Sequence, residues 1–161
     1  MKKKLTAIVL FLCLLSATPA EAHRVHFPKE SQMENFLVKN WKHTVFAENF
    51  DIYRDKKGRT GKQYPTDTGG KIDILAISKD KKTFLVIELK RGGTSDTVIG
   101  QCQRYMGFVK EKLAKKGQEV RGAIVASKTN KKIKRALSVV PNIDFYKYKI
   151  NYKVIHLERV E

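Results

Sequence analysis

The most informative part of the chain is residues 69–91, which read GGKIDILAISKDKKTFLVIELKR. Two runs rich in aliphatic and β-branched residues, 71–77 and 83–90, flank the polar stretch 78–82, a pattern typical of two strands joined by a turn. Both faces of these runs are apolar, and such strands are usually covered on both faces. The stretch therefore predicts a hairpin that helices or further structure cover on each side.

Three charged side chains interrupt the apolar pattern: Asp73, Glu88 and Lys90. An ionised group inside an apolar strand is unfavourable unless it is paired or binds a metal. If the turn is centred on Asp80 and Lys81, Asp73 lies directly opposite Glu88, with the two Cβ atoms about 5 Å apart. Lys90 follows Glu88 by two residues, so all three side chains share one face.

Two carboxylates this close repel each other, and a divalent cation between them removes the repulsion. A small number of oxygen ligands, with room for water and a phosphate, suits Mg²⁺. Lys90 would then lie beside the metal, where it could orient a water or offset negative charge on a phosphate. From spacing alone, the alternative is a cross-strand salt bridge of Lys90 with Asp73 or Glu88 on a solvated hairpin.

Asp73, fourteen intervening residues and then Glu88-Leu89-Lys90 resemble the D…(D/E)-x-K signature of the PD-(D/E)XK, or restriction-endonuclease-like, nuclease superfamily. Longer blocks are similar to its NucS/EndoMS branch of mismatch-cleaving endonucleases. These blocks are 63–69 (QYPTDTG), 71–76 (KIDILA), 86–91 (VIELKR) and 100–107 (GQCQRYMG). The resemblance covers roughly residues 30–154, and the ordered set of blocks is far more specific than the short signature.

The resemblance implies a metal-dependent endonuclease that hydrolyses phosphodiester bonds in DNA. It implies Asp73 and Glu88 as ligands of Mg²⁺ or Mn²⁺, and Lys90 as the residue that orients or deprotonates the attacking water. It also implies Gln101 at the rim of the active site and Glu34 as an acidic residue of the first helix that reaches the metal. Longer family members carry a separate N-terminal domain for dimerisation and DNA binding, for which this chain has no room. Mismatch specificity therefore does not follow from the resemblance.

The composition is strongly basic, with 33 Lys and Arg against 16 Asp and Glu and a formal charge of +17 in 161 residues. This length suits one domain with a real core. The charge exceeds what solubility requires. It favours a polyanionic partner, with nucleic acid first and an anionic membrane surface second.

The first residues have the pattern of a secretory signal: three lysines at 2–4, an apolar run over 5–15 and an Ala-x-Ala site at 20–22. The apolar run is short for a transmembrane span. The pattern predicts a signal peptide over 1–22 and a single exported domain over 23–161, periplasmic or secreted, without stable membrane association after cleavage. The alternatives are an uncleaved anchor or a misassigned start, which would leave the protein cytoplasmic. The mature chain would keep only Cys102 and hence no internal disulfide.

Ser31 followed by Glu34 resembles a capping box at the start of a helix that runs to about Trp41. Glu34 thus has two compatible interpretations, as a cap and as a site residue. A first strand is expected within 43–53. A glycine-containing basic loop, 55–62, follows, and its cations are well placed for phosphate contacts. The expected nucleic-acid contacts are Lys56, Lys57, Arg59 and Lys62, together with Arg91 beside the signature.

A second helix is expected from about Ser95 to Lys116, ended by Gly117. Gln101 and Tyr105 lie four residues apart and share a face of it. Tyr105 either packs in the core or contacts the nucleic acid.

A strand at 120–126, a short helix at 130–140 and edge strands at 143–150 and 152–157 complete the prediction. The strand–helix–strand connection implies a parallel pair with a right-handed crossover. The expected fold is α/β: a mixed central sheet of the restriction-endonuclease type, flanked by helices.

Two functional alternatives remain at this point. One is an inactive nucleic-acid-binding module of the same fold, and the other is an exported nuclease effector. An intact signature argues against the inactive module, because a binding module has no need of these buried charges. DNA is the expected partner, although RNA is open, and a small nuclease that cuts both strands would often act as a homodimer.

Overall fold

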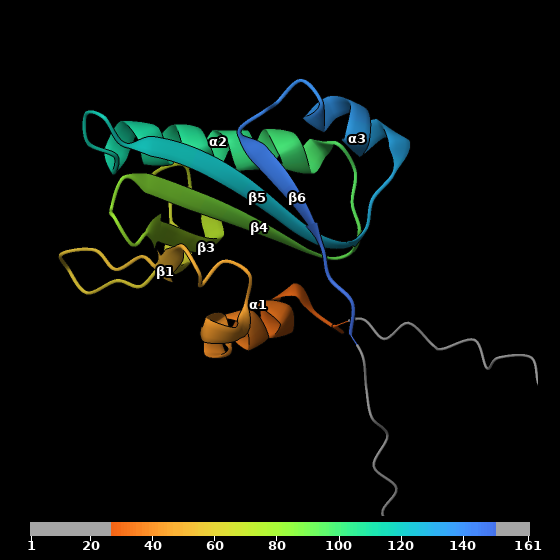
Figure 1. Ribbon diagram of the computed structural model, residues 1–161, viewed down its shortest axis with the longest axis horizontal. Coiled ribbons are helices and arrows are strands. Elements are labelled where there is room, and N and C mark those ends of the chain that lie inside the picture. The colour runs from red at the N-terminus through yellow and green to blue at the C-terminus, as the bar shows by residue number, and fades with distance from the viewer. Residues whose placement is uncertain (1–26, 151–161) are drawn as a thin grey trace, which may run out of the picture.

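The computed structural model of the chain describes residues 27–150. They form a mixed six-stranded sheet with helices on both faces (Figure 1). Helices α2 and α3 lie on one side of the sheet and α1 lies on the other. The elements are α1 (Glu30–Lys39), a 3₁₀ turn (Trp41–His43), β1 (Phe50–Ile52), β2 (Lys62–Pro65), β3 (Lys71–Ser78), β4 (Thr83–Gly93), α2 (Thr97–Lys112), β5 (Glu119–Lys128), α3 (Lys131–Leu137) and β6 (Ile143–Lys147). The predicted α/β fold is confirmed.

The central hairpin has the predicted register. β3 and β4 are antiparallel, with Ile77 opposite Phe84 and Ile74 opposite Ile87. The same register, one residue further, sets Asp73 against Glu88. At that position the regular ladder ends, and the backbone N–H of Leu89 donates to Asp73 Oδ2 at 2.8 Å.

The second half of the sheet is parallel, as expected from the strand–helix–strand order. β4 pairs with β5 in parallel, and β5 pairs with β6 in parallel. Helix α2 forms the connection between β4 and β5 and packs on both strands. It lies close to β5 because Gly122 has no side chain. A Cβ at Gly122 would lie only 2.7 Å from Cys102 Sγ.

The hairpin is buried on both faces, which explains its continuous apolar pattern. Leu75 and Val86 point into the core beneath α2. Ile74 and Ile87 point into a second core beneath α1. All four side chains are fully buried. The hairpin is therefore held between two packed layers, and Asp73 and Glu88 lie next to the fully buried residues Ile72 and Leu89.

Some predicted boundaries are wrong. The expected capping box is absent: α1 begins at Glu30 behind Lys29, whose side chain makes no capping hydrogen bond, so Ser31 already lies inside the helix. The first strand is only Phe50–Ile52, because a 3₁₀ turn and further turns occupy most of the preceding stretch. Helix α2 ends at Lys112 rather than at Lys116.

One strand was not predicted at all. Residues 62–65, of which Lys62 was expected as the end of a loop and the rest had no predicted element, form β2 and pair antiparallel with β3, with Tyr64 opposite Ile72. Tyr64 is 2% exposed and anchors β2 in the core. This strand brings the segment around Lys62 against the β3–β4 hairpin.

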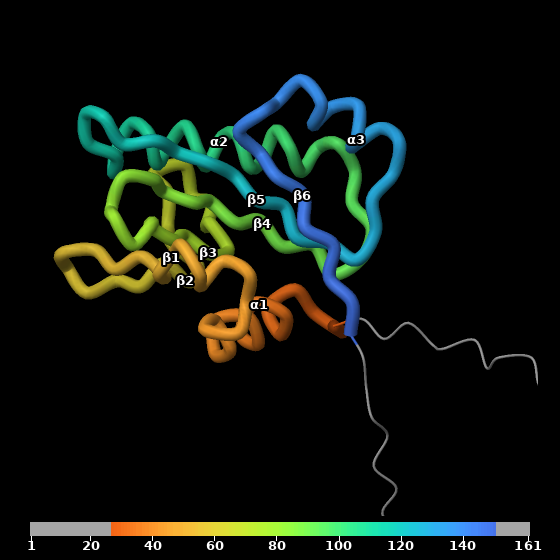
Figure 2. Tube along the Cα trace, in the orientation of Figure 1, coloured from red at the N-terminus to blue at the C-terminus, as the bar shows by residue number. Residues whose placement is uncertain are grey.

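The first and last described residues lie side by side (Figure 2), and the rings of Phe27 and Tyr148 are 5.8 Å apart between centroids. The predicted leader over 1–22 and the predicted strand over 152–157 lie outside the described residues. Within residues 27–150, none of the helices is long and apolar enough to cross a membrane.

Candidate active site

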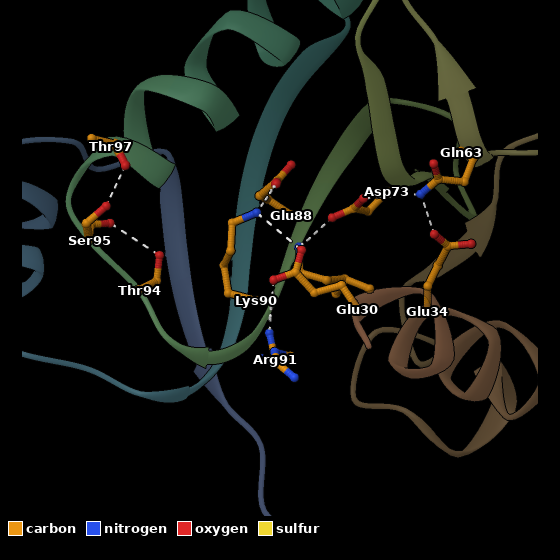
Figure 3. Close-up of polar contacts among 11 residues, drawn as sticks. Glu30, Glu34, Gln63, Asp73, Glu88, Lys90, Arg91, Thr94, Ser95 and Thr97 are labelled. Atoms are coloured by element: carbon orange, nitrogen blue, oxygen red, sulfur yellow. Dashed lines mark hydrogen bonds and ion pairs between the residues drawn. The ribbon is translucent and has the colours of Figure 1, made fainter. Parts of the chain in front are cut away.

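The signature residues meet at the open end of the β3–β4 hairpin, away from its turn (Figure 3). Asp73 comes from β3, and Glu88 and Lys90 come from β4. Glu88 is 1% exposed, so its carboxylate has almost no access to water. Glu88 is therefore not on a solvated face of the hairpin, which was the condition for the purely structural interpretation.

The environment works against ionisation of both carboxyl groups. Burial, with the nearby charge of Asp73 as the second cause, raises the pKa of Glu88 to about 7. Burial also raises the pKa of Asp73, although the hydrogen bond from the Leu89 backbone opposes the effect. Glu88 Oε2 is buried and has no hydrogen-bond partner among residues 27–150. A buried oxygen without a donor is unfavourable and marks a place where a ligand can bind.

Lys90 forms the salt bridge with Glu88 that the structural alternative expected, but this bridge leaves the second oxygen of Glu88 without a partner among the described residues. Its Nζ donates to Glu88 Oε1 at 2.8 Å and lies 3.7 Å from Glu30 Oε2. Burial alone would lower the pKa of Lys90, but the neighbouring carboxylates, Glu88 above all, raise it above its ordinary value. Lys90 satisfies one oxygen of Glu88 and leaves the other unpaired, so the salt bridge does not account for the whole arrangement.

Helix α1 supplies a further acidic residue, Glu34, which is 3% exposed. Its carboxylate accepts a hydrogen bond from the Gln63 side-chain amide and lies 3.5 Å from Lys62 Nζ. The same Gln63 nitrogen donates to Asp73 Oδ1 at 3.2 Å. Glu34 is thus joined to Asp73 through the Gln63 side-chain amide (Figure 3). The capping interpretation of Glu34 has no support, because no side chain caps α1, whereas its position beside Asp73 agrees with the interpretation as a site residue.

Gln63 holds this position in an unusual backbone conformation. Its φ is +48°, in the left-handed region that glycine and asparagine favour. Such a conformation is unfavourable and persists only where surrounding contacts fix it. The side chain of Gln63 lies between two carboxylates, and a pocket there is lined by Glu30, Glu34, Asn35, Lys62, Gln63 and Asp73.

Two residues of the site were missed by the sequence analysis. Gln63 opens one of the family-like blocks, and this was the only signal that could have singled it out. Glu30 lies one helical turn before Glu34, so the two share a face of α1, and that spacing could have revealed it. Glu30 faces Lys90, and its Oε1 accepts from the Arg91 backbone N–H at 3.3 Å.

Gln101 and Tyr105 lie on α2 and are both half-buried. Tyr105 packs against the core beneath α2, and a Cβ added at Gly70 would lie 2.9 Å from its hydroxyl. Gln101 makes no side-chain hydrogen bond to the described part of the chain. The structure therefore gives Tyr105 a packing role and leaves the role of Gln101 a prediction.

A sequence model of the PD-(D/E)XK nuclease superfamily matches residues 18–155, most of the 161-residue chain. The chain belongs to this superfamily. The predicted family is thus confirmed, and the matched range includes the blocks that carried the resemblance.

Solved structures of repair endonucleases resemble this PD-(D/E)XK chain. A repair endonuclease from Pyrococcus abyssi shares 29% identity with a TM-score of 0.56, and the match covers 77% of this chain and 48% of that one. A complex of EndoMS with double-stranded DNA shares 24% identity with a TM-score of 0.57, and the match covers 78% of this chain and 46% of that one. At this identity the match shows similarity of fold. The chain thus spans about half the length of these proteins. It matches no curated protein sequence.

The acidic pair of this PD-(D/E)XK site fits a divalent cation. Two carboxylates converge, and one oxygen of Glu88 lacks any donor among the described residues. Within residues 27–150, no group of three Asp, Glu, His or Cys side chains is arranged to hold a metal by itself. A pair of carboxylates with remaining positions for water and phosphate is the arrangement that Mg²⁺ usually has in phosphate-processing sites.

The predicted nucleic-acid contacts divide into two groups. Lys56 and Lys57 are exposed on the turn before β2. Arg59 is tied to Asp55 at 2.6 Å and lies over the Tyr64 ring, 5.3 Å from its centroid.

Lys62 and Arg91 lie nearer to the acidic cluster. Lys62 Nζ donates to Asn35 Oδ1 at 2.5 Å besides facing Glu34. Arg91 Nη1 donates to the Pro28 carbonyl at 2.6 Å. The basic loop thus offers fewer uncommitted cations to a nucleic acid than its sequence indicates.

Proposed function

We propose that this chain is a metal-dependent endonuclease that hydrolyses phosphodiester bonds in DNA. The observation that carries the proposal is the Glu88 carboxylate, which is almost fully buried next to Asp73, with one oxygen unpaired within residues 27–150. A binding module without catalysis has no reason to retain a buried acid whose pKa is raised to about 7.

Asp73 and Glu88 are the residues that would hold Mg²⁺ or Mn²⁺. When bound, such a cation polarises a phosphoryl oxygen and neutralises charge that develops during hydrolysis. The protein contributes the burial of Glu88 and the partial burial of Asp73, which limit the access of bulk water. It also contributes the Leu89 N–H and the Gln63 amide, which fix the direction of the Asp73 carboxylate.

Lys90 contributes a positive charge to the site. Because its pKa is raised, it is an ammonium group at neutral pH and carries no lone pair with which to accept a proton. This supports an orienting and charge-stabilising role: the ammonium donates to a water or to a phosphate oxygen. Glu88 and Glu30 hold it in position from two sides.

DNA is the proposed substrate for two reasons. The basic composition favours a polyanion. The similar solved proteins are described as a repair endonuclease and as EndoMS bound to double-stranded DNA. A homodimer and export of residues 23–161 belong to the same proposal, and intact-mass analysis of the native protein would test the expected cleavage before His23.

Incubation of the chain with supercoiled plasmid and with a panel of linear, mismatched, branched and single-stranded DNAs tests the proposal. Mg²⁺ or Mn²⁺ should produce cleavage, and EDTA should stop it. Asp73→Ala serves as the matched control for a contaminating nuclease. Cleavage that persists in Asp73→Ala, or no cleavage of any nucleic acid with any divalent metal, would contradict the proposal.

A further inference from the structure

We propose that α3 and the loop before α2 form a second DNA-contact surface, which binds backbone phosphates beside the site of cleavage. The surface consists of the loop 93–96, Lys128, Asn130 and the cations of α3, which are Lys131, Lys132, Lys134 and Arg135. We refer to it as the α3 surface. It rests on the proposed function, because it identifies where the nucleic acid runs after it leaves the acidic pair.

The first argument is charge. Residues 120–143 include six Lys or Arg and no Asp or Glu. The four cations of α3 are all exposed, and they form no ion pair with any described residue. Unpaired cations concentrated on one short helix are what phosphate binding requires, since each one neutralises a phosphate and releases counterions.

The second argument is orientation. Ile133 is the residue of α3 that is fully buried, and it fixes the helix to the body of the protein. The Asn130 side chain accepts from the Ile133 backbone N–H at 2.9 Å, and its amide donates to the Thr94 carbonyl at 3.2 Å. The charged side chains are thus presented to solvent by a helix that is tied to the loop before α2.

The third argument is position. β4 carries Glu88 and Lys90 and continues to Gly93, which pairs with Lys128 of β5. Figure 3 shows the loop with Thr94 and Ser95 running from the acidic cluster to the start of α2. A pocket between this loop and α3 is lined by Gly93, Thr94, Ser95, Asp96, Asn130, Lys131 and Lys132. The hydroxyl, amide and ammonium groups of this pocket are donors of the kind that bind phosphate oxygens, whereas the Asp96 carboxylate, also in the lining, opposes an anion.

The α3 surface differs from the predicted basic loop in how its cations are used. Arg59 and Lys62 are held by Asp55 and by Glu34. A carboxylate partner neutralises part of the charge of such a cation, so the cation attracts a phosphate less strongly. Lys56 and Lys57 of the loop are exposed and outside the ion pairs of the described residues, but α3 gathers four such cations on one helix, so the α3 surface concentrates more unpaired charge.

Nucleic acid fits this surface better than a membrane does. A helix that lies on lipid needs an apolar face in contact with acyl chains. The apolar residue Ile133 faces the protein interior instead. Val139, after the end of α3, is the exposed large hydrophobic residue of this region, and its presence makes anionic vesicles a necessary arm of the test.

The test is a titration of a fluorescent DNA duplex with the full chain in EDTA, where cleavage is stopped, over a series of NaCl concentrations. The variant is Lys131→Gln with Lys132→Gln, which removes two charges and keeps side chains of similar helix propensity. The matched control is Lys115→Gln with Lys116→Gln. These exposed lysines follow the far end of α2, about 24 Å from its start at 1.5 Å per residue.

The α3 variant should bind more weakly, and the slope of log K against log salt should become shallower by about 0.9 for each phosphate that is no longer neutralised. Lys131→Arg with Lys132→Arg should restore it, and the control should match the wild type. An unchanged slope in the α3 variant, an equal change in the control, or weaker binding to anionic vesicles with DNA binding intact would overturn the proposal. Failure of the wild type to cut DNA, with the slope change intact, would instead refute the proposed catalysis and retain the α3 surface.

Discussion

The carboxylates at the two ends of the β3–β4 hairpin have pKa values shifted in opposite directions. At the turn, Asp80 accepts a hydrogen bond from the Ser78 hydroxyl at 2.5 Å and another from the Lys82 backbone N–H at 3.0 Å. The Ser78 hydrogen bond lowers the pKa of Asp80. At the open end, burial raises the pKa of Asp73 and of Glu88, and one oxygen of Glu88 has no donor in the described structure.

The hairpin therefore carries one carboxylate at its turn, Asp80, whose ionised form is stabilised by its donors, and two at its open end for which burial outweighs the donors they have. Asp73 accepts from the Gln63 amide and the Leu89 N–H, whereas Glu88 accepts from Lys90 at one oxygen alone among the described residues. Asp80 completes a turn, and its ionised form is stabilised by what surrounds it. Glu88 is buried and Asp73 partly buried beside it, which disfavours the charge that both would carry at neutral pH. Ionised carboxylates in an unfavourable environment, within a fold whose other parts are well packed, usually mark a functional site.

The largest expected effect is on cleavage, and it separates the two ends. Glu88→Gln should abolish metal-dependent cleavage, because the neutral amide cannot serve as a carboxylate ligand, while the protein stays folded. Asp80→Asn should leave cleavage at the wild-type rate, because the turn takes no part in the chemistry. Plasmid cleavage with Mg²⁺ and with Mn²⁺, together with calorimetric metal titration, measures both.

Equal metal binding by the wild type and Glu88→Gln would remove this end of the hairpin from the active site. The Asp80→Asn variant controls for non-specific damage to the hairpin, because it changes one carboxylate of the same two strands.

Lys90→Ala should have the next largest effect. The metal should still bind, because its ligands remain, whereas the rate of cleavage should fall by about 10²–10³-fold, the range expected for loss of a positioned group that stabilises developing charge. Single-turnover cleavage at saturating metal isolates this step. If Lys90 served only to pair with Glu88, its removal would lower the melting temperature and leave the rate per folded molecule unchanged.

The stability of the metal-free protein should depend on pH through Glu88. Its pKa in the folded protein, about 7, lies above the ordinary 4.5. The contribution of the group is therefore fully present below about pH 4.5 and is lost as the pH rises through 7. The difference corresponds to about 3 kcal/mol of unfolding free energy. Chemical denaturation in EDTA should show Glu88→Gln more stable than the wild type at pH 8, with the difference vanishing near pH 4.5.

Asp80 should act in the opposite sense. Because its pKa is lowered, its contribution is present at neutral pH and is lost only when acid protonates it. Asp80→Asn should therefore not reproduce the behaviour of Glu88→Gln between pH 5 and 8. A wild type and a Glu88→Gln variant with parallel stability profiles over this range would contradict the raised pKa.

The sequence was sufficient to predict the hairpin, its register and the meeting of Asp73 with Glu88. Two apolar runs joined by a short polar turn leave little freedom in how such strands pair, so the pairing of Ile74 with Ile87 follows from local pattern. The parallel β4–β5 pair followed from the order of elements, and the short helix expected within 130–140 is present as α3, Lys131–Leu137.

The remainder depended on interactions between distant segments. β2 contains a proline and exposed residues, so it reads as loop until pairing with β3 defines it. The sequence also could not show which cations are already paired, because the partner of Lys62 is Glu34 on another element. For the same reason the basic loop seemed richer in free charge than it is, and the amide of Gln63 could not be assigned to the site.

The smallest expected effect concerns backbone conformation at the two ends of the hairpin. Two described residues other than glycine have positive φ: Lys81, at +61°, in the hairpin turn, and Gln63, at +48°, beside the acidic pair. Glycine adopts this conformation without the steric penalty. Lys81→Gly should therefore change the unfolding free energy by no more than about 1 kcal/mol and leave cleavage intact.

Gln63→Gly should likewise change the unfolding free energy by about 1 kcal/mol or less. Loss of the steric penalty of the positive φ stabilises the variant and offsets the loss of the hydrogen bonds that the Gln63 side chain makes. Yet it removes the amide that joins Glu34 to Asp73, so metal affinity or cleavage should fall by about 10–100-fold, as is usual for partners of metal ligands. Calorimetric metal titration and single-turnover cleavage of both glycine variants make the comparison. Equal activity of the two variants would mean that the positive φ of Gln63 serves only the path of the β2 backbone. A selective loss in Gln63→Gly would mean that the strain is retained because it directs the amide between the two carboxylates.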